Sequence, residues 1–432
     1  MSDLFLTNGL VIDPARDVRE KINCVIRRGR VAEWTKAKQP PTGVPVLDVD
    51  GAVVAPGFID LHVHFRDPGE EYKEDIASGL AAAAAGGFTS VVCMANTKPV
   101  NDCAAVTRYM RHAAQMVDGV RLYPVGAMTR GLAGEALADI GDLAAEGVVG
   151  ISDDGKTVAN TLIMRRAMEY ASDFQLPVIV HCEDPHLAGE GVMHEGAVST
   201  RLGLRGRPSA SEYLIVERDI TLAQLTNARL HVQHVSAREA VEAVRRAKAA
   251  KVGVTVEVTP HHLFLTDETL ADFDPNYKMY PPLRTEADQT ALRRALKDGT
   301  IDAIATDHAP HSTLEKEERP IELAAAGVIG LETAVPVSYR LVEERLISLS
   351  RFVDLLTRGP AAALRLPHGR LAVGDTADVT VFDPRQQLQI DATQFRSKSR
   401  NCPFHGWICH GKVLFTIVGG RICYEARMAR SG

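Results

Sequence analysis

The feature that most constrains the fold is a repeated unit in which an apolar run is followed by a helical pattern. Eight such runs fill the middle of the 432-residue chain. They are residues 55–64, 89–96, 120–128, 148–154, 177–184, 228–236, 252–260 and 301–310. Alternating strands and helices predict a parallel sheet, and eight units predict a closed (β/α)8 TIM-like barrel. A doubly wound open sheet is the alternative arrangement.

The two ends of the chain follow a different pattern, with short apolar runs and no helical repeat. Residues 4–13 contain an Asn-Gly pair and residues 411–425 a Gly-Gly pair, both typical of β-hairpins. The simplest arrangement joins both ends in one small domain with the barrel inserted between them. We therefore expect a β-sandwich domain from residues 1–54 plus 366–432, and a barrel domain over residues 55–365.

Composition and charge exclude several classes of protein. The formal net charge is −6 and no Lys/Arg block stands out, which argues against binding to nucleic acid or an anionic membrane. No apolar run reaches the ~18–20 residues of a membrane span, and the N-terminus lacks the pattern of a signal peptide. The seven cysteines are scattered without a CxxC pair, as in a reducing compartment. We expect a cytoplasmic protein that acts on a small molecule.

Polar residues cluster where the predicted strands end, which is where barrel enzymes build their sites. His62 and His64 are two residues apart in a strand, so both side chains point the same way and can reach one metal ion. The candidate ligands at the strand ends are His62, His64, Asp154, His181, His234 and Asp307. Nitrogen and carboxylate donors without thiolate suit Zn²⁺, Mn²⁺ or Co²⁺. Six ligands exceed the usual three for one catalytic zinc, so we expect a two-metal site.

Each of these residues also has a structural explanation when it is taken alone. The alternatives are core histidines at 181 and 234, a turn at Asp154 and a helix cap at Asp307. His261 and His262, after the seventh run, fit either core histidines or groups that orient a ligand. The shared position at the ends of strands in one barrel favours a common site over separate structural roles.

A set of longer motifs runs along nearly the whole chain. They are PGFIDLHVHFRDPG (56–69), MANTKPV (94–100), SDDG (152–155), HCED (181–184), QHVS (233–236), TPHHL (259–263), ATDHAPH (305–311), SKSRNCPFHG (397–406) and TIVGGRICY (416–424). Together they resemble the amidohydrolase superfamily and, more narrowly, the bacterial class I dihydroorotases. An HxH pair alone would point only to the superfamily, whereas HFRDPG with DDG and TDHAPH is a specific combination.

The resemblance implies a zinc site of one or two ions per chain. It assigns His62, His64 and Asp307 to the more buried ion, His181 and His234 to the other, and Asp154 to a place between them. Asp154 is preferred to Asp153 because its spacing to His181 fits the family pattern. The related hydantoinases and dihydropyrimidinases carry a carboxylated lysine at the bridging place. Here no lysine occurs in that segment before Lys156, which favours the dihydroorotases.

The resemblance also implies the reaction, which is reversible hydrolysis of (S)-dihydroorotate to N-carbamoyl-L-aspartate in pyrimidine biosynthesis. In that reaction a metal-bound hydroxide attacks the ring carbonyl and Asp307 is the general acid and base. The alternatives are another cyclic amidase, of the allantoinase or hydantoinase type, and a non-catalytic partner of aspartate carbamoyltransferase. For an active enzyme the family implies a homodimer, with aspartate carbamoyltransferase as a candidate partner.

The substrate side matches the family in part. The implied substrate contacts are Arg66, Asn96, Tyr280, His311, Ala326 and Gly327. An Arg fork suits the ring carboxylate, although Arg66 also fits a surface salt bridge with Asp67 or Glu70, and His311 fits loop capping. Tyr280 stands where the family has Asn, and residues 325–327 read Ala-Ala-Gly in place of Pro-Phe-Gly. These departures affect the ring pocket and leave the metal ligands untouched.

Overall fold

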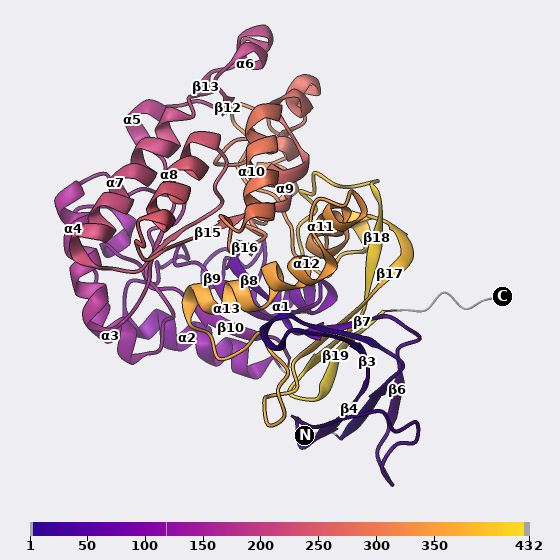
Figure 1. The fold of residues 1–432 in the computed structure, drawn as a ribbon. Helices are drawn as coiled ribbons and strands as arrows, with labels where there is room; N and C mark the ends of the chain where they lie inside the picture. Colours follow the sequence, from indigo (N-terminus) through magenta and orange to yellow (C-terminus); the bar gives the residue numbers. More distant parts are fainter. Residues whose placement is uncertain (1–2, 118, 427–432) are drawn as a thin grey trace.

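The middle of the chain forms a ring of parallel strands with helices around it (Figure 1). This is a computed structural model, which describes residues 3–117 and 119–426. The members of the ring, in order, are β8 (Phe58–Val63), β9 (Phe88–Cys93), β10 (Arg121–Pro124), the segment 149–152, β11 (Val178–Val180), β14 (Leu230–Val232), β15 (Val254–Val258) and β16 (Ala303–Ile304). Their parallel pairing confirms the predicted barrel over the doubly wound sheet.

Two irregular connections close the ring. The fourth predicted strand is reduced to isolated parallel bridges, in which Ile151 pairs with Gly126 on one side and with Val178 on the other. The last member meets the first through a parallel bridge between Val63 and His308. The barrel is therefore closed, and every predicted apolar run supplies one of its members.

Helices cover the outside of the ring. They are α1 (Ile76–Ala85), α2 (Ala104–Met116), α3 (Ile140–Ala145), α4 (Thr161–Asp173), α7 (Ala210–Thr226), α8 (Arg238–Ala249), α10 (Glu286–Asp298), α11 (Ala334–Glu343), α12 (Leu349–Leu356) and α13 (Arg358–Leu364). In α8 the buried residues Ala240, Val244 and Ala247 recur every three or four positions and form one apolar face. Glu239 in its first turn and Lys248 in its last suit the helix dipole. Among the described helices, none is long and apolar enough to span a membrane.

Two longer excursions leave the carboxyl ends of strands. The first follows β11, projects at the top of Figure 1 and contains α5 (Pro185–Ala188), β12 (Met193–His194), α6 (Ala197–Leu202) and β13 (Gly206–Arg207). The second follows β15 and contains α9 (Pro260–Phe264) and the 3₁₀ turns η3 (Asp267–Asp272) and η4 (Pro275–Tyr277). Both excursions lie at the end of the barrel where a site is expected.

The two ends of the chain build two sheets over a shared core. One sheet has the order β19-β18-β17-β7-β2-β3 and the other β5-β4-β1-β6. The strands are β1 (Leu4–Thr7), β2 (Leu10–Asp13), β3 (Val18–Lys21), β4 (Asn23–Arg27), β5 (Arg30–Thr35), β6 (Val46–Asp48), β7 (Val53–Pro56), β17 (Val379–Gln389), β18 (Ile408–Val418) and β19 (Arg421–Glu425). Leu6 and Ile26 of one sheet share an apolar cluster with Val54, Val381 and Ile417 of the other, as in a β-sandwich. The domain boundaries at 54/55 and 365/366 stay a prediction.

The segment between β17 and β18 reaches the mouth of the barrel. Asn401 lies in it, is buried, and donates from Nδ2 to the carbonyl oxygens of Ala309 and Gly327, both at 3.0 Å. Its Oδ1 accepts the backbone N–H of His311 at 3.2 Å. The C-terminal part of the chain therefore helps to build the rim of the barrel, which the sequence analysis did not anticipate.

Candidate active site

Four histidines and two aspartates converge at the carboxyl ends of the barrel strands. His62 is in β8 and His64 follows it, while the others follow the fourth to sixth members and the last: Asp154, His181, His234 and Asp307. All six side chains are buried, with residue exposures of 6% or less. The barrel thus brings together residues that lie up to 245 positions apart in the sequence.

Asp154 lies at the centre of this cluster. Its Oδ2 is 3.4 Å from His62 Nε2 and 3.3 Å from His64 Nε2. Its Oδ1 is 3.8 Å from His181 Nδ1 and 3.7 Å from His234 Nε2. One carboxylate is therefore divided between two histidine pairs, one pair on each oxygen.

Asp153, the neighbouring carboxylate, points elsewhere. Its Oδ1 accepts the backbone N–H groups of Met128 at 2.8 Å and Thr129 at 2.9 Å, and its Oδ2 accepts the Thr129 hydroxyl. Successive residues of an extended segment face opposite sides, so only one of the two aspartates can face the cluster. The geometry favours Asp154 for the bridging place.

Asp307 sits beside the first histidine pair. Its Oδ1 is 3.2 Å from His64 Nε2 and 3.5 Å from His62 Nε2. Burial acts to raise the pKa of Asp307, but these two histidines outweigh it and hold that pKa below its ordinary value. The carboxylate is therefore ionised at neutral pH and able to accept a proton.

Three residues of the site have left-handed backbone conformations. The φ angles are 60° at Arg66, 29° at His234 and 48° at Asp307. Such angles cost free energy in residues other than glycine, and they gather at functional sites where the surrounding fold holds them. Here they turn side chains from three different strand ends into one cavity.

Glu257 supports the site from below, inside the barrel. Its Oε1 is 2.9 Å from His62 Nδ1 and its Oε2 is 3.1 Å from His231 Nε2. Because Nδ1 of His62 is occupied in this way, Nε2 is the nitrogen that faces Asp154. The sequence analysis missed Glu257, and the available signal was a lone carboxylate in the otherwise apolar strand 254–258.

Asn96 has a similar supporting position on the other side. Its Oδ1 accepts the Nδ1–H of His64 at 2.8 Å, and its Nδ2 donates to the backbone carbonyl of Asp154 at 3.4 Å. The side chain predicted to contact substrate therefore also orients one of the candidate metal ligands. Asn96 still lines the cavity, so the two roles are compatible.

A cavity of about 210 Å³ opens over the cluster. Its lining includes all six predicted substrate contacts, Arg66, Asn96, Tyr280, His311, Ala326 and Gly327, together with Asp154, His64, His181, His234, Asp307, Gly155, Ala309 and Glu183. Of the candidate ligands only His62 lies behind this surface. Glu183, in the HCED motif, is a lining residue that the sequence analysis did not single out.

Arg66 forms no ion pair with any described residue, and its Nε donates only to the carbonyl of Pro310 at 3.3 Å. The two acids proposed as its alternative partners are engaged elsewhere. Asp67 accepts the Tyr109 hydroxyl at 2.8 Å, and Glu70 pairs with Lys73 and Lys98. The guanidinium therefore faces the cavity without a carboxylate partner.

His311 has one ring nitrogen in use and one free. Its Nε2–H donates to the carbonyl of Ala326 at 2.9 Å, while Nδ1 is buried without a hydrogen-bond partner. With the proton on Nε2, Nδ1 is an acceptor. It is therefore suited to an N–H or O–H group of a ligand in the cavity.

The donor set fits a metal centre. Two groups of three side chains place one donor atom each within 4.8 Å of the others, and Asp154 belongs to both. The buried Asp154 Oδ1 has no hydrogen-bond partner, which suits an atom that bonds to a cation. All donors are imidazole nitrogens or carboxylate oxygens, the set used in catalytic zinc sites. Among the described residues, Cys182 is not one of the side chains whose donor atoms meet there, and burial raises the pKa of its thiol well above the ordinary value.

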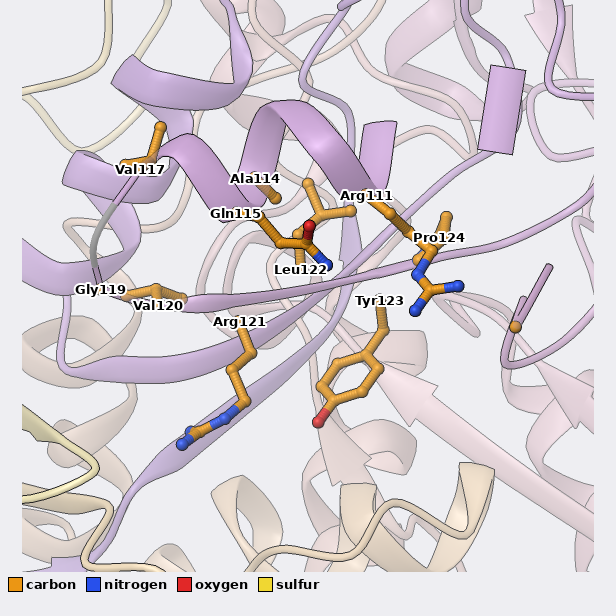
Figure 2. Close-up of a pocket in the computed structure, with 11 residues that line it drawn as sticks. Arg111, Ala114, Gln115, Val117, Gly119, Val120, Arg121, Leu122, Tyr123 and Pro124 are labelled. Carbon is orange, nitrogen blue, oxygen red and sulfur yellow. The ribbon is translucent and has the colours of Figure 1, made fainter. Parts of the chain in front are cut away.

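A second, larger cavity lies along β10, from its amino end to Pro124, and includes residues of α2 in its lining (Figure 2). It measures about 380 Å³, and its lining also includes Arg121 and Tyr123, whose side chains project from the same side of the strand. Arg121 Nη1 donates to Asp378 Oδ2 at 2.7 Å, and the Tyr123 hydroxyl is 2.5 Å from His368 Nε2. Because these groups are already paired, the larger cavity is not the candidate active site.

Comparison with known families identifies the class of protein. Residues 53–423 match the model of the Amidohydrolase family. The chain belongs to the amidohydrolase family.

Full-length relatives narrow the comparison. The chain is 51% identical to the dihydroorotase of Syntrophotalea carbinolica over 98% of this chain and 99% of that protein. It is 52% identical to the dihydroorotase of Anaeromyxobacter dehalogenans, again over 98% and 99%. The dihydroorotase of Geobacter metallireducens is 49% identical over 98% of this chain and 100% of its own length. The predicted resemblance is therefore confirmed along the whole chain.

Solved structures support the fold. L-hydantoinase from Arthrobacter aurescens superposes with a TM-score of 0.88 at 23% identity, covering 98% of this chain and 96% of that one. D-hydantoinase from a Thermus species superposes with a TM-score of 0.81 at 24% identity, covering 98% and 95%. At these identities the likeness extends to the barrel and its β domain and carries no argument about substrate.

Proposed function

We propose that this chain catalyses the dihydroorotase reaction, the reversible hydrolysis of (S)-dihydroorotate to N-carbamoyl-L-aspartate. The observation that carries the proposal is the unpaired guanidinium of Arg66 in the cavity above the histidine and aspartate cluster. A ring carboxylate would supply the anion that this guanidinium lacks, in a charge-assisted hydrogen bond. Rings without a carboxylate, such as hydantoin, gain little from such a group. The near-full-length relatives named dihydroorotase support the same reaction.

The cluster would hold one or two zinc ions. His62, His64 and Asp307 would hold one ion and His181 and His234 the other, with Asp154 shared between them; the short distances within each group support this assignment. When bound, zinc supplies Lewis-acid polarisation of a carbonyl and lowers the pKa of water to about 7. Glu257 and Asn96 hold the rings of His62 and His64 in the orientations that this requires.

Asp307 is the proton carrier in this proposal. Its carboxylate is ionised beside His64, so it can take the proton of the attacking water. The C–N bond of the ring amide breaks as the carbonyl carbon gains the water oxygen. Asp307 then returns the proton to the departing ring nitrogen. In the reverse reaction the same carboxylate takes the proton of the attacking nitrogen and returns it to the departing water oxygen.

The remaining lining residues orient the ring. Arg66 would bind the carboxylate, and the free Nδ1 of His311 would accept an N–H of the substrate. Tyr280 and the backbone of Ala326 and Gly327 form the walls. The departures from the family pattern at Tyr280 and at residues 325–327 therefore change the walls of the pocket and leave its charged end intact.

The cellular compartment, the oligomeric state and the partner of this protein are also part of the proposal. All seven cysteines are free, which supports a reducing compartment such as the cytoplasm. A homodimer and an association with aspartate carbamoyltransferase rest on the resemblance alone. Light scattering of the purified protein, alone and mixed with the carbamoyltransferase, tests both.

The decisive experiment measures turnover of dihydroorotate and N-carbamoyl-L-aspartate, with zinc content determined on the same sample. Hydantoin and allantoin are the controls. We expect turnover of the two carboxylate-bearing compounds with one or two zinc ions per chain. Activity confined to the neutral rings would move the assignment to another cyclic amidase. A zinc-free, inactive protein that binds the carbamoyltransferase would make it a non-catalytic partner.

A further inference from the structure

Arg207 ties together three separate segments beside the active site. It lies in β13, at the base of the excursion after β11, and is only 7% exposed. Its guanidinium carbon is 3.4 Å from the centre of the Tyr280 ring, in contact with the face of that ring. Tyr280 lines the active-site cavity, whereas Arg207 does not. Arg207 therefore backs the tyrosine from outside, so that the ring forms a wall between the guanidinium and the cavity.

Hydrogen bonds fix both partners of this stack. Arg207 Nε donates to the carbonyl of Gly191 at 2.5 Å, and the Tyr280 hydroxyl donates to the same oxygen at 3.1 Å. Gly191 has no room for a side chain, because a Cβ there would come within 2.3 Å of the Gly206 carbonyl oxygen. Close backbone packing therefore holds the Gly191 carbonyl in place. Its two hydrogen bonds fix the position of the Tyr280 ring relative to the Arg207 guanidinium.

The Arg207 guanidinium also pairs with a carboxylate that lines the cavity. Arg207 Nη1 donates to Glu183 Oε2 at 2.5 Å, and that oxygen is 3.9 Å from His181 Nε2. Without Arg207, the Glu183 carboxylate would add an unpaired negative charge to a cavity that receives anions. The ring wall and the charge of the cavity therefore depend on one side chain.

We infer that Arg207 is a positioning residue that sets the substrate specificity of this site, by holding Tyr280 as a flat wall and keeping Glu183 paired. The inference rests on the proposed function and deepens it, since it names the residues that shape the wall beside the ring whose carboxylate Arg66 would bind. Tyr280, which stands where related sequences have an amide side chain, works as a wall only because Arg207 supports its outer face. A planar fork is needed for this, because a lysine can pair with Glu183 but cannot stack and bond to Gly191 together.

The test is a double-mutant cycle between Arg207 and Tyr280. In the zinc-loaded enzyme, Arg207→Met and Tyr280→Ala should each raise KM for dihydroorotate about tenfold, with kcat changed less. If Arg207 acts through Tyr280, the double variant is no worse than the more damaged single variant. Arg207→Lys should recover only part of the affinity, and Tyr280→Phe should stay within about threefold of the parent.

A matched control lies in the same excursion. Arg201 is exposed and pairs with the exposed Glu268, so Arg201→Met should leave KM unchanged. Zinc content and thermal unfolding, measured on every variant, separate a folding defect from a change in the pocket. If Arg207→Met does not fold, the comparison of Arg207→Lys with Tyr280→Phe carries the test.

A binding measurement separates this inference from the proposed function. Orotate, the planar unsaturated analogue of the substrate, is titrated calorimetrically into the zinc-loaded parent and the variants. Coupled losses of orotate affinity support the role of Arg207 even if the parent fails to turn over dihydroorotate. Three results would overturn the inference: additive effects in the cycle, full recovery by Arg207→Lys, or an unchanged KM in Arg207→Met. In each case, turnover of dihydroorotate by the parent would leave the proposed function intact.

Discussion

The two ends of the barrel each carry arginine, histidine and aspartate side chains, and they differ in how those side chains are paired. At the amino end, Asp378 accepts hydrogen bonds from Arg121 and from the backbone of Gly419, and it also contacts His368. At the carboxyl end, Asp154 Oδ1 and His311 Nδ1 are buried without a partner. The active-site cavity is thus lined by buried groups that a ligand can complete, whereas both oxygens of Asp378 already have partners.

The pairing of the side chains distinguishes the two ends of the barrel better than the cavity volumes do. The cavity along β10 is larger, at about 380 Å³ against 210 Å³, yet its Arg121 already pairs with a carboxylate. Buried polar groups without partners cost free energy, and a fold retains them where a ligand completes them. The amino-end cluster therefore stabilises the junction between barrel and sandwich, and the carboxyl-end cluster keeps groups that a ligand can complete.

The largest expected effect comes from the carboxyl end. Asp307→Asn keeps the size of the side chain and removes the proton acceptor, so kcat for dihydroorotate should fall about 10³-fold. The fold should be retained, because Asn fills the same space, although the variant loses the charge that His62 and His64 contact. Steady-state kinetics and circular dichroism of the zinc-loaded protein measure turnover and fold. A kcat within tenfold of the parent would remove Asp307 from the proposed role.

A smaller effect is expected from the unpaired guanidinium. Arg66→Lys keeps the charge and loses the fork, so KM for dihydroorotate should rise about 10- to 100-fold, as expected for the loss of charge-assisted hydrogen bonds. Arg121→Lys is the matched variant at the other end and should leave KM unchanged. Equal KM values for the two variants would contradict the contrast between the two ends.

The Asp378 cluster at the amino end should show the opposite result, a loss of stability without a loss of activity. Asp378→Asn removes the charge that Arg121 and His368 share, and the free energy of unfolding should fall by about 1–3 kcal/mol. The kinetic constants for dihydroorotate should stay those of the parent. Urea unfolding, followed by circular dichroism, and steady-state assays of the same preparation provide the comparison. A loss of activity without a loss of stability would place function at the amino end as well.

The fold could be predicted from the sequence wherever buried positions require apolar residues. Parallel barrel strands are covered on both sides, so they read as apolar runs, and the helices between them keep a regular apolar face. The course of the segment that carries Asn401 was not predictable. Its direction depends on hydrogen bonds to Ala309 and Gly327, which lie 92 and 74 positions away.

The candidate site was predictable for a related reason. Parallel strands end on one side of the sheet, so histidines and aspartates at strand ends had to meet. Strand alternation alone does not separate Asp153 from Asp154, because it places them on opposite sides without telling which one faces inward. The preference for Asp154 comes from the resemblance, through its spacing to His181. Glu257 escaped notice because its partner His62 is 195 residues away and no local pattern joins them.

The smallest effect concerns a cation at the carboxyl end that has no counter-ion. Lys316 is fully buried and donates from Nζ to the carbonyls of Lys278 at 2.8 Å and Ala325 at 2.9 Å. None of the described carboxylates pairs with it. Burial, followed by repulsion from Lys278, lowers the pKa of Lys316 from 10.5 to about 7. Arg121 at the amino end, by contrast, has a counter-ion in Asp378.

The lowered pKa predicts a particular dependence of stability on pH. Between about pH 7 and pH 10 the unfolded chain keeps a proton that folded Lys316 has released, so the free energy of unfolding rises with pH. Below about pH 7 both states hold the proton and the contribution is flat. Lys316→Met abolishes the titration, so the parent should gain up to about 1 kcal/mol per pH unit relative to this variant from pH 7 to 9. Parallel urea-derived stability curves for the two proteins would mean that Lys316 keeps an ordinary pKa, and that a buried ammonium needs only carbonyl oxygens to stay charged at this wall of the pocket.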